Sequence, residues 1–331
     1  MDGRVTLKDV AAQAGVSVST ASRALDERLP LSRSAAAERV RAAAADLGYQ
    51  RDITASSLRR RGSGTIGVLV PRLSDTVMAL MFEALYAEAA QLGQFALVSV
   101  CGDDPGRELQ AAEQLLARRV DGLVLAGSRL DDALTASLRA RGVPHVLVLR
   151  TDGVSPSAVC DDELGGYLAT RHLLDMGHRR IGVLPGPVFA STARGRLAGY
   201  RRAMAEAGAT VDEGWVRPSG FAYDAGETEG RALLTGHPDT TAVFAANDNL
   251  ALGVMSAARG LGRSVPDDLS VVGYNDTPVA TALPVPLTSV RVPFSEVATQ
   301  ALRLLASGAE GPSRAVAVPT LIPRESSRSL S

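Results

Sequence analysis

The sequence predicts an all-α head followed by a two-lobed α/β core, and three observations lead to this prediction. The chain has 331 residues, which exceeds one typical domain. Helix-capping residues and helical apolar spacing fill the first 51 residues, whereas short apolar runs alternate with amphipathic stretches from Thr65 onward. The alternating part occurs as two series. We therefore expect two doubly wound parallel sheets, one in each lobe.

The first helix of the head is expected to begin after Thr6. The run Thr6-Leu7-Lys8-Asp9 resembles a capping box in which Asp replaces Glu, and the acidic side chain also favours the positive end of a helix. Apolar residues then recur at the spacing of one helical face: Leu7, Val10, Ala11 and Ala14. Gly15 provides a tight break after about two turns.

A second helix is expected after Ser17, which is a good N-cap. Its inward positions are Ala21, Ala24 and Leu25, so its outward positions are Val18, Ser19, Ser22 and Arg23. A third helix should bury Val40, Ala43, Ala44 and Leu47 and end at Gly48. Two helices joined by a short glycine-containing turn form a helix-turn-helix, which presents its second helix to the major groove of DNA. The same caps and spacing are also compatible with any small three-helix bundle.

The segment from Asp52 to Gly64, DITASSLRRRGSG, joins the head to the core. Its composition is typical of a solvated linker, yet Leu58 is large and apolar and directly precedes three arginines. The predicted organisation is a head at residues 1–51, a linker at 52–63 and a core at 64–331.

The core begins with four β-like runs, TIGVLV, FALVSV, GLVLAG and HVLVLR, and continues with RIGVLPG, TAVFAA and LSVVGY. Helical stretches separate these runs, which is the pattern of parallel sheets. We expect the lobes to divide near Cys160–Asp161. Folds of this kind bind ligands at the carboxyl ends of their strands, in the cleft between the lobes.

Charge is distributed unevenly along the chain. Residues 1–61 hold 11 basic and 7 acidic side chains, a net charge of +4, whereas the remainder holds 24 and 29, a net charge of −5. A basic head favours a polyanionic partner, although +4 is weak support by itself. No apolar run approaches the roughly 18 residues of a membrane helix, and the N-terminus lacks an apolar signal core. We therefore expect a cytoplasmic protein with no membrane partner.

No motif in the sequence supports a cofactor, a metal site or catalysis. The run GSGTIG at residues 62–67 matches a dinucleotide fingerprint but precedes a predicted strand, whereas the fingerprint must follow a strand and open a helix. The two cysteines and four histidines lack metal-ligand spacing. Of the histidines, His172 and His178 flank a helix end and are expected to be capping or surface residues. We expect no cofactor, no metal and no enzymatic activity.

Motifs along almost the whole chain resemble those of the lactose-repressor/galactose-repressor family of bacterial transcription regulators. In the head and linker they are VTLKDVAAQAGVSVSTASRAL and LGYQRDITASSLRRRGSGTIGVLVP. In the core they are RVDGLVL, HLLDMGHRRIGVLPGP, RGRLAGYRRAM, FAANDNLALG, DLSVVGYNDTPVA, PLTSVRVPF and LIPRESS. The resemblance implies a core like that of periplasmic sugar-binding proteins. Its first lobe would comprise residues 64–160 and 292–317, and its second lobe residues 161–291 and 318–328.

The resemblance implies two sets of DNA contacts in the head. The base-reading set is Val18, Ser19 and Arg23, and the phosphate-binding set is Thr6, Ser17, Thr20 and Ser22. Arg23 is able to contact guanine or to bind phosphate instead. For Thr6 and Ser17 the alternative is helix capping alone, and both roles can coexist.

The resemblance also implies DNA contacts in the linker, at Ser56, Leu58 and Arg59. In the family this segment forms a short hinge helix on DNA, and Leu58 aligns with the leucine that enters the minor groove. A two-turn helix is marginal alone, so folding coupled to DNA binding is physically reasonable. One head offers few base contacts, so we expect a homodimer on a near-palindromic double-stranded operator. The chain ends at Ser331 without a heptad segment, which favours a dimer over a tail-linked tetramer.

The resemblance places an effector in the cleft between the lobes. The implied effector-binding residues are Asp75, Met78, Arg150, Arg194, Arg196, Phe221, Asn247 and Asn275. Arg196 matches the principal ligand-binding arginine of the family, and Phe221 matches an aromatic residue that stacks on ligand rings. Asp248 begins a helix beside the cleft, and a purely structural role is its alternative.

Two positions depart from the pattern of the family and bear on the effector. Arg150 stands where some members have a ligand-binding Asp, and Asn275 occupies a position that is often Asp. Both departures make the pocket less acidic, which favours an anionic effector such as a phosphorylated sugar or a carboxylate.

The sequence thus predicts a sequence-specific DNA-binding transcriptional regulator, and most simply a repressor. Its effector, a carbohydrate or derivative, would change DNA affinity through its different affinities for two states of the protein. Induction and co-repression are both open. One alternative is a solute-binding protein of the periplasmic sugar-binding type, which would need an export signal and no DNA-binding head. The other is an enzyme, which would turn over a substrate.

Overall fold

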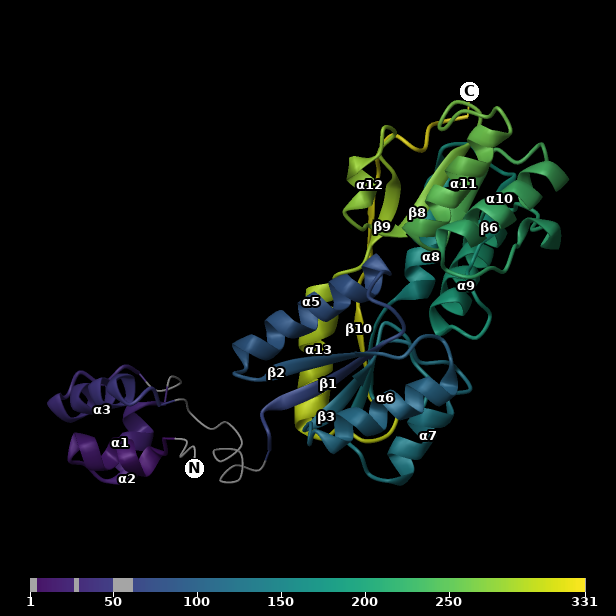
Figure 1. The fold of residues 1–331 in the computed structure, drawn as a ribbon. Helices are drawn as coiled ribbons and strands as arrows, with labels where there is room; N and C mark the ends of the chain where they lie inside the picture. Colours follow the sequence, from purple (N-terminus) through teal and green to yellow (C-terminus); the bar gives the residue numbers. More distant parts are fainter. Residues whose placement is uncertain (1–4, 27–29, 50–61, 331) are drawn as a thin grey trace. The chain divides into compact units, whose positions relative to one another are not determined.

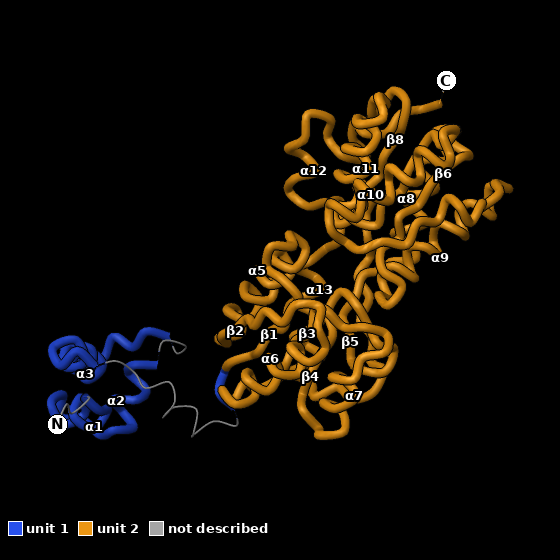
Figure 2. Tube along the Cα trace, turned by 45° about the vertical axis from the view of Figure 1, so that its right-hand side comes forward, with its two compact units in different colours: residues 1–64 blue, residues 65–331 orange. Residues whose placement is uncertain are grey.

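The computed structural model describes residues 5–26, 30–49 and 62–330. The chain divides into two compact units, residues 1–64 and 65–331, which Figure 2 draws in two colours. The described helices of the first unit are α1 (Leu7–Ala14), α2 (Val18–Ala24) and α3 (Ala35–Asp46). The second unit contains two sheets, each with helices on both faces (Figure 1). The predicted class, an all-α head and a two-lobed α/β core, is confirmed.

Caps fix the turn between α1 and α2. The Asp9 carboxylate accepts from the amide of Thr6 at 2.8 Å and from its hydroxyl at 2.7 Å, which closes the start of α1. Gly15 ends α1 with φ at +64°, a conformation that costs glycine little. Ser17 then accepts from the amide of Thr20 at 3.1 Å and caps α2. The three helices share a small apolar core that includes Val10, Ala21 and Val40.

The first sheet has the order β10-β5-β4-β3-β1-β2, and all of its pairs are parallel. Its strands are β1 (Thr65–Val70), β2 (Phe95–Val100), β3 (Gly122–Leu125), β4 (His145–Val148), β5 (Ser157–Cys160) and β10 (Arg314–Ala317). One face is covered by α5 (Thr76–Gln91) and α13 (Phe294–Ser307), and the other by α6 (Pro105–Ala117) and α7 (Ala133–Ala140), as Figure 1 shows. The predicted runs form β1 to β4. No predicted run corresponds to β5 or β10, which are short and poor in large apolar side chains.

The second sheet has the order β11-β9-β8-β7-β6. Its strands are β6 (Ile181–Leu184), β7 (Ala242–Ala245), β8 (Ser270–Asn275), β9 (Thr288–Arg291) and β11 (Thr320–Ile322). One face packs against α8 (Asp162–Asp175) and α9 (Ser191–Glu206), and the other against α10 (Tyr223–Gly236) and α11 (Asp248–Gly260). The remaining elements are the 3₁₀ turn η1 (Glu213–Trp215) and α12 (Val279–Ala282).

The chain passes between the two sheets three times. It leaves the first sheet between β5 and α8, returns between β9 and α13, and leaves again between β10 and β11. Because β9 runs toward the first lobe and β11 runs away from it, these two strands pair antiparallel. The expectation of wholly parallel sheets is therefore wrong at this edge.

The expectation for His178 is also wrong. Its side chain is buried, with Nδ1 3.0 Å from the hydroxyl of Thr241 and Nε2 3.0 Å from the carbonyl oxygen of Arg328. His172 is partly buried, with Nε2 2.9 Å from the hydroxyl of Ser327. Both histidines therefore fasten the C-terminal segment to the second lobe. No helix in the described part of the chain has the length and apolarity to cross a bilayer.

Candidate functional site

A pocket lies between the two lobes of the second unit, where strands of both sheets end. It encloses about 460 Å³ of space between protein atoms, part of which is open solvent. The first lobe contributes Asp75, Val77, Met78, Leu149, Arg150 and Cys160. The second lobe contributes Asp162, Thr192, Arg196, Phe221, Asn247 and Asn275, and Val292 lies at a crossing between the lobes.

Seven of the eight residues that the sequence assigned to the cleft line this pocket: Asp75, Met78, Arg150, Arg196, Phe221, Asn247 and Asn275. Arg194 is the exception. Its side chain is exposed and borders a separate hollow, and its Nε donates to the carbonyl of Val188 at 3.4 Å. Helix geometry explains the difference, because residues two apart on α9 point about 200° away from each other. Arg194 and Arg196 therefore face different surroundings.

Asp162 and Thr192 line the pocket but were not among the residues predicted from the sequence. Asp161 caps α8 by accepting from the amide of Leu164 at 2.9 Å, and Asp162 occupies the first helical position beside the pocket. An acidic pair directly after a strand was the available signal. Such pairs are common at helix starts generally, so the signal was not specific.

The most extensively bonded polar side chain in the pocket is that of Arg196. Its Nε donates to Oδ1 of Asp162 at 2.8 Å, and both side chains are buried. Its Nη1 donates to the carbonyl of Ala246, and its guanidinium carbon lies 3.7 Å from the centroid of the Tyr274 ring. Burial raises the pKa of Asp162 above its ordinary value, although Arg196 opposes this shift. The ion pair thus neutralises both charges inside the pocket.

Arg150 enters the pocket from a sharp turn at the end of β4. Its amide donates to the carbonyl of Val148 at 2.7 Å across Leu149, whose φ is +66°. This is a γ-turn centred on a left-handed residue, a conformation that costs free energy for any side chain larger than glycine. The next amide, that of Thr151, donates to the hydroxyl of Ser191 in the second lobe at 3.0 Å.

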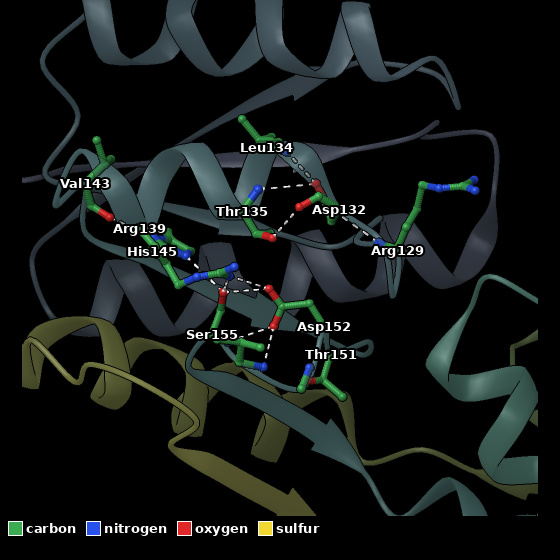
Figure 3. A network of polar contacts seen from close by, with 12 residues as sticks. Arg129, Asp132, Leu134, Thr135, Arg139, Val143, His145, Thr151, Asp152 and Ser155 are labelled. Atoms are coloured by element: carbon green, nitrogen blue, oxygen red, sulfur yellow. Dashed lines mark hydrogen bonds and ion pairs between the residues drawn. The ribbon is translucent and has the colours of Figure 1, made fainter.

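The loop after Arg150 is held by a polar network centred on Asp152 (Figure 3). The Asp152 carboxylate accepts from the amides of Val154 at 2.9 Å and Ser155 at 2.7 Å, and it forms an ion pair with Arg139 of α7 at 2.7 Å. Burial opposes its charge, but the hydrogen bonds from Ser155 and Val154 outweigh burial and hold the pKa of Asp152 below its ordinary value. The network therefore fixes the segment that carries Arg150.

The guanidinium of Arg150 is buried but sparsely bonded. Its side chain is 8% exposed, and Nη1 donates to the carbonyl of Gly127 at 3.0 Å. Its guanidinium carbon lies 5.2 Å from the ring centroid of Phe221 and 6.0 Å from that of Phe189, both in the second lobe. Burial, together with repulsion from Arg196, lowers the pKa of Arg150 to about 10. The side chain therefore stays charged at neutral pH.

Phe221 is positioned by Asn247. The Asn247 amide donates from Nδ2 to the carbonyl of Phe221 at 2.9 Å, and its Oδ1 accepts from the amide of Leu250 at 2.7 Å, which caps α11. A Cβ at Gly186 would lie 2.9 Å from Cζ of Phe221, so glycine leaves room for the ring. Asn247 therefore supports the aromatic wall of the pocket as well as lining it.

The remaining acidic candidates have different roles. Asp75 caps α5 by accepting from the amide of Val77 at 3.0 Å, and burial raises its pKa above the ordinary value. Asp248 accepts from the hydroxyl of Ser289 at 2.6 Å and from the amide of Thr277 at 2.7 Å. Asp248 does not line the pocket. The structural alternative for Asp248 therefore fits this arrangement.

The head presents the predicted DNA-binding residues on the outward side of α2. Ser17, Val18, Ser19, Thr20 and Arg23 are exposed and Ser22 is partly buried. The hydroxyl of Ser17 lies 2.8 Å from the hydroxyls of both Ser19 and Thr20, which forms a small hydroxyl cluster at the start of the helix. The hydroxyl of Thr6 donates to Asp9. The linker residues Ser56, Leu58 and Arg59 lie outside the described residues.

Comparisons with known proteins agree on both units. Residues 6–52 match the family described as bacterial regulatory proteins, lacI family, and residues 170–327 match the periplasmic binding protein-like domain. The HTH-type transcriptional regulator DegA of Bacillus subtilis is 30% identical over 336 residues, which cover 99% of each chain.

Solved structures give the same result. A lac repressor dimer bound to operator and the anti-inducer ONPF is 30% identical, with a TM-score of 0.83, and the match covers 98% of this chain and 99% of that one. A complex of the transcriptional regulator CelR with cellobiose is 32% identical, with a TM-score of 0.74, and the match covers 98% of this chain and 100% of that one.

Proposed function

The chain belongs to the lacI family of bacterial regulatory proteins, and from this membership we propose that it is a repressor that binds operator DNA as a homodimer under the control of a small-molecule effector. The observation that supports this proposal best is the joint presence of the two required parts. The head exposes a row of base-reading side chains on α2, and the core closes a pocket with residues from both lobes.

In the head, α2 would lie in the major groove of the operator. Val18 suits contact with a thymine methyl group, Ser19 both donates and accepts, and Arg23 suits bidentate contact with guanine. The hydroxyls of Thr6, Ser17, Thr20 and Ser22 suit contact with phosphates, which fix the register of the protein without reading sequence. Arg23→Met should relax base preference at one position of each half-site, at a cost of about 1–3 kcal/mol.

The linker at residues 52–63 is proposed to act as a hinge on DNA. Ser56 and Arg59 would contact the backbone, and Leu58 would enter the minor groove at the centre of the operator. Leu58→Ala should weaken operator binding and leave effector affinity unchanged. Equal operator affinities for the two proteins, measured by fluorescence anisotropy, would count against the minor-groove role.

The core offers a surface that suits dimer formation. Strand β2 is an edge of the first sheet, and its Phe95 and Leu97 are 63% and 38% exposed. Helix α5 packs against this strand and exposes Tyr86. Exposed apolar residues on a sheet edge are a typical interface feature. Phe95→Asp should yield monomers in sedimentation velocity, whereas Val154→Asp, at an exposed apolar residue elsewhere on the first lobe, should not.

The pocket is proposed to bind a carbohydrate or a derivative of one. CelR, which is similar over nearly the whole chain, has a structure with cellobiose. In this chain the pocket combines an aromatic wall at Phe221 with donors and acceptors from both lobes, so a ligand would contact both lobes at once. An effector shifts DNA affinity only by binding two states unequally, and lobe closure supplies two such states.

Two other functions make different predictions. A solute-binding protein without a DNA role would show no salt-dependent association with duplex DNA. An enzyme would turn over a member of a metabolite panel.

The deciding experiment is selection of bound duplexes from a random pool, with and without that panel. We expect a near-palindromic consensus whose recovery changes with one metabolite. A consensus without symmetry, or no enrichment, would contradict the dimeric repressor.

A further inference from the structure

We propose that the effector carries an oxyanion, a carboxylate or a phosphate, and that Arg150 selects for it. The proposal rests on the proposed function only in taking the pocket between the lobes as the effector site. It is carried by the guanidinium of Arg150, which is nine-tenths buried, lines the pocket and forms no ion pair with any described residue.

In the described structure Arg150 has no ion-pair partner, although the carboxylates of Asp75, Asp103 and Asp162 attract it at longer range. Its one hydrogen bond goes to a neutral acceptor, the carbonyl of Gly127, and in the part of the chain that the structure describes its Nε and Nη2 have no hydrogen-bond partner. The two rings that flank it, Phe221 and Phe189, supply apolar walls with a weak electrostatic attraction and no counter-charge. A buried cation of this kind is costly unless an anion arrives.

Neighbouring charges in the pocket do not substitute for a ligand. Asp162 is engaged by Arg196 at 2.8 Å, so that pair neutralises itself. Asp75 is the other carboxylate of the pocket, but its Oδ1 accepts from the amide of Val77 at the start of α5, and it forms no ion pair with Arg150. The 16-residue helix α5 also directs its positive end toward this side of the pocket, because Val77 and Met78 line it. The surroundings thus favour an anion at Arg150.

The guanidinium is also held in place rather than carried on a loose loop. The γ-turn at Leu149 fixes the backbone before the side chain, and the amide of Thr151 is bonded to Ser191. Asp152 ties the following residues to Arg139, as seen in Figure 3. A pre-organised guanidinium is suited to bidentate recognition of a planar or tetrahedral oxyanion.

An anion at this position would also affect closure of the lobes. Arg150 belongs to the first lobe, while Phe189 and Phe221 belong to the second. Closing the cleft therefore removes a cation from water without supplying an ion-pair partner, since the nearby Asp162 is already engaged by Arg196. A bound oxyanion supplies that partner, so it should bind the closed state more tightly than the open one. Selectivity and regulation would then depend on the same residue.

The test compares the full-length protein with Arg150→Met, which keeps an unbranched apolar stem and removes the charged guanidinium. Arg303→Met, at an exposed arginine of α13, is the matched control. Thermal unfolding at constant ionic strength is followed with sodium phosphate, glucose 6-phosphate, gluconate and glucose as the probes. Calorimetric titration then gives dissociation constants for the probes that stabilise.

We expect at least one of the three anionic probes to raise Tm for the unaltered protein and for Arg303→Met, and glucose to have a smaller effect. Arg150→Met should bind that probe at least about 30-fold more weakly. Without any probe, Arg150→Met should unfold at an equal or higher temperature, because a buried charge that has no ion-pair partner has been removed.

The proposal would be overturned by equal binding of an anion to both proteins, by preference for glucose, or by no response to any anion. Operator binding is measured separately on the same samples. If the unaltered protein binds its operator but responds to no anion, this inference alone is refuted. If the unaltered protein does not bind operator DNA, the proposed function is refuted.

Discussion

The contact between α8 and α9 allows a quantitative prediction, because these two helices carry Asp162 and Arg196. Their backbones touch at Gly199. A Cβ at this position would overlap the carbonyl oxygen of Glu163 and lie 2.5 Å from the amide nitrogen of Tyr167. Both obstacles are backbone atoms, so no side-chain rotation can make room. Gly199→Ala must push the two helices apart.

The cost follows from that separation. Non-bonded heavy atoms are comfortable at about 3.5–4.0 Å, so the gap to the carbonyl oxygen of Glu163 has to open by at least about 1.5 Å, which forfeits about half or more of the dispersion energy of the affected contacts. Overpacking typically costs about 1–3 kcal/mol, and the rigid backbone places this case at the upper end. Alanine recovers about 1 kcal/mol of helix propensity relative to glycine. The expected net loss is about 2 kcal/mol, which corresponds to a fall in Tm of about 4–8 °C for a domain of this size.

The assay is thermal unfolding by circular dichroism, with effector affinity measured on the same protein. The 2.8 Å ion pair between Arg196 and Asp162 spans the two helices, so its geometry and effector binding should deteriorate with the packing. The control is Gly236→Ala at the end of α10, where a Cβ meets no atom within 4 Å. This variant should be unchanged or more stable by up to about 1 kcal/mol. Equal stability of Gly199→Ala and Gly236→Ala would refute the reasoning.

Three further predictions concern the cleft, the second lobe and the head. The ring of Phe189, in the second lobe, has its centroid 4.0 Å from the guanidinium carbon of Arg129 in the first lobe. Phe189→Ala removes this contact, so small-angle scattering should show a more open core. Val188→Ala, at a side chain that is 68% exposed, should leave the scattering unchanged. Burial raises the pKa of Asp248 to about 6, so between about pH 4 and pH 6 the folded protein binds more protons than the unfolded chain. The free energy of unfolding should therefore fall as pH rises through this window, and Asp248→Asn should flatten that slope in urea titrations. Ser17→Ala removes the cap of α2 and should destabilise the head by about 1 kcal/mol, detectable by hydrogen exchange of the Thr20 amide; unchanged exchange would contradict the capping role.

The sequence was sufficient to predict elements with strong local signals. The runs that became β1 and β6 are buried strands of large apolar residues, and Gly15 with Ser17 marks the turn of the head. Strands such as β5 and β10 lack that signal, because four residues of mixed character are recognisable only when a neighbouring strand supplies the hydrogen bonds. The antiparallel pairing of β11 depends on where the chain re-enters the second lobe, which no local pattern encodes.

The pocket shows the same division between local and long-range information. Motif positions placed seven of the eight predicted side chains at one pocket, and helical phase explains why Arg194 faces elsewhere. Asp162 was not predictable as a pocket residue, because its ion pair with Arg196 arises only when α8 packs against α9. The burial of Arg150 depends on two rings that come from the other lobe, more than 35 positions along the chain.

Backbone strain connects the two sides of the pocket. Leu149, after β4 in one sheet, and Asn275, at the end of β8 in the other, both have positive φ, at +66° and +96°. Such conformations cost about 1–3 kcal/mol each and persist only where surrounding contacts enforce them. A carboxylate follows each strained residue, three positions on after Leu149 and directly after Asn275, and each carboxylate forms ion pairs within its own lobe. Asp152 is bound by Arg139 at 2.7 Å, and Asp276 by Arg291 at 2.7 Å and Arg324 at 2.6 Å.

These two anchored turns place Arg150 and Asn275 at the pocket from opposite lobes. Because the ion pairs of Asp152 and Asp276 each lie within one lobe, they should persist when the lobes move, whereas the hydrogen bond from Thr151 to Ser191 crosses the lobes. A ligand that touches both turns would then respond to the distance between the lobes rather than to local flexibility. The response to an effector is therefore set by lobe closure. Substitutions at Asp152 or Asp276 should weaken effector binding, although neither side chain contacts the effector.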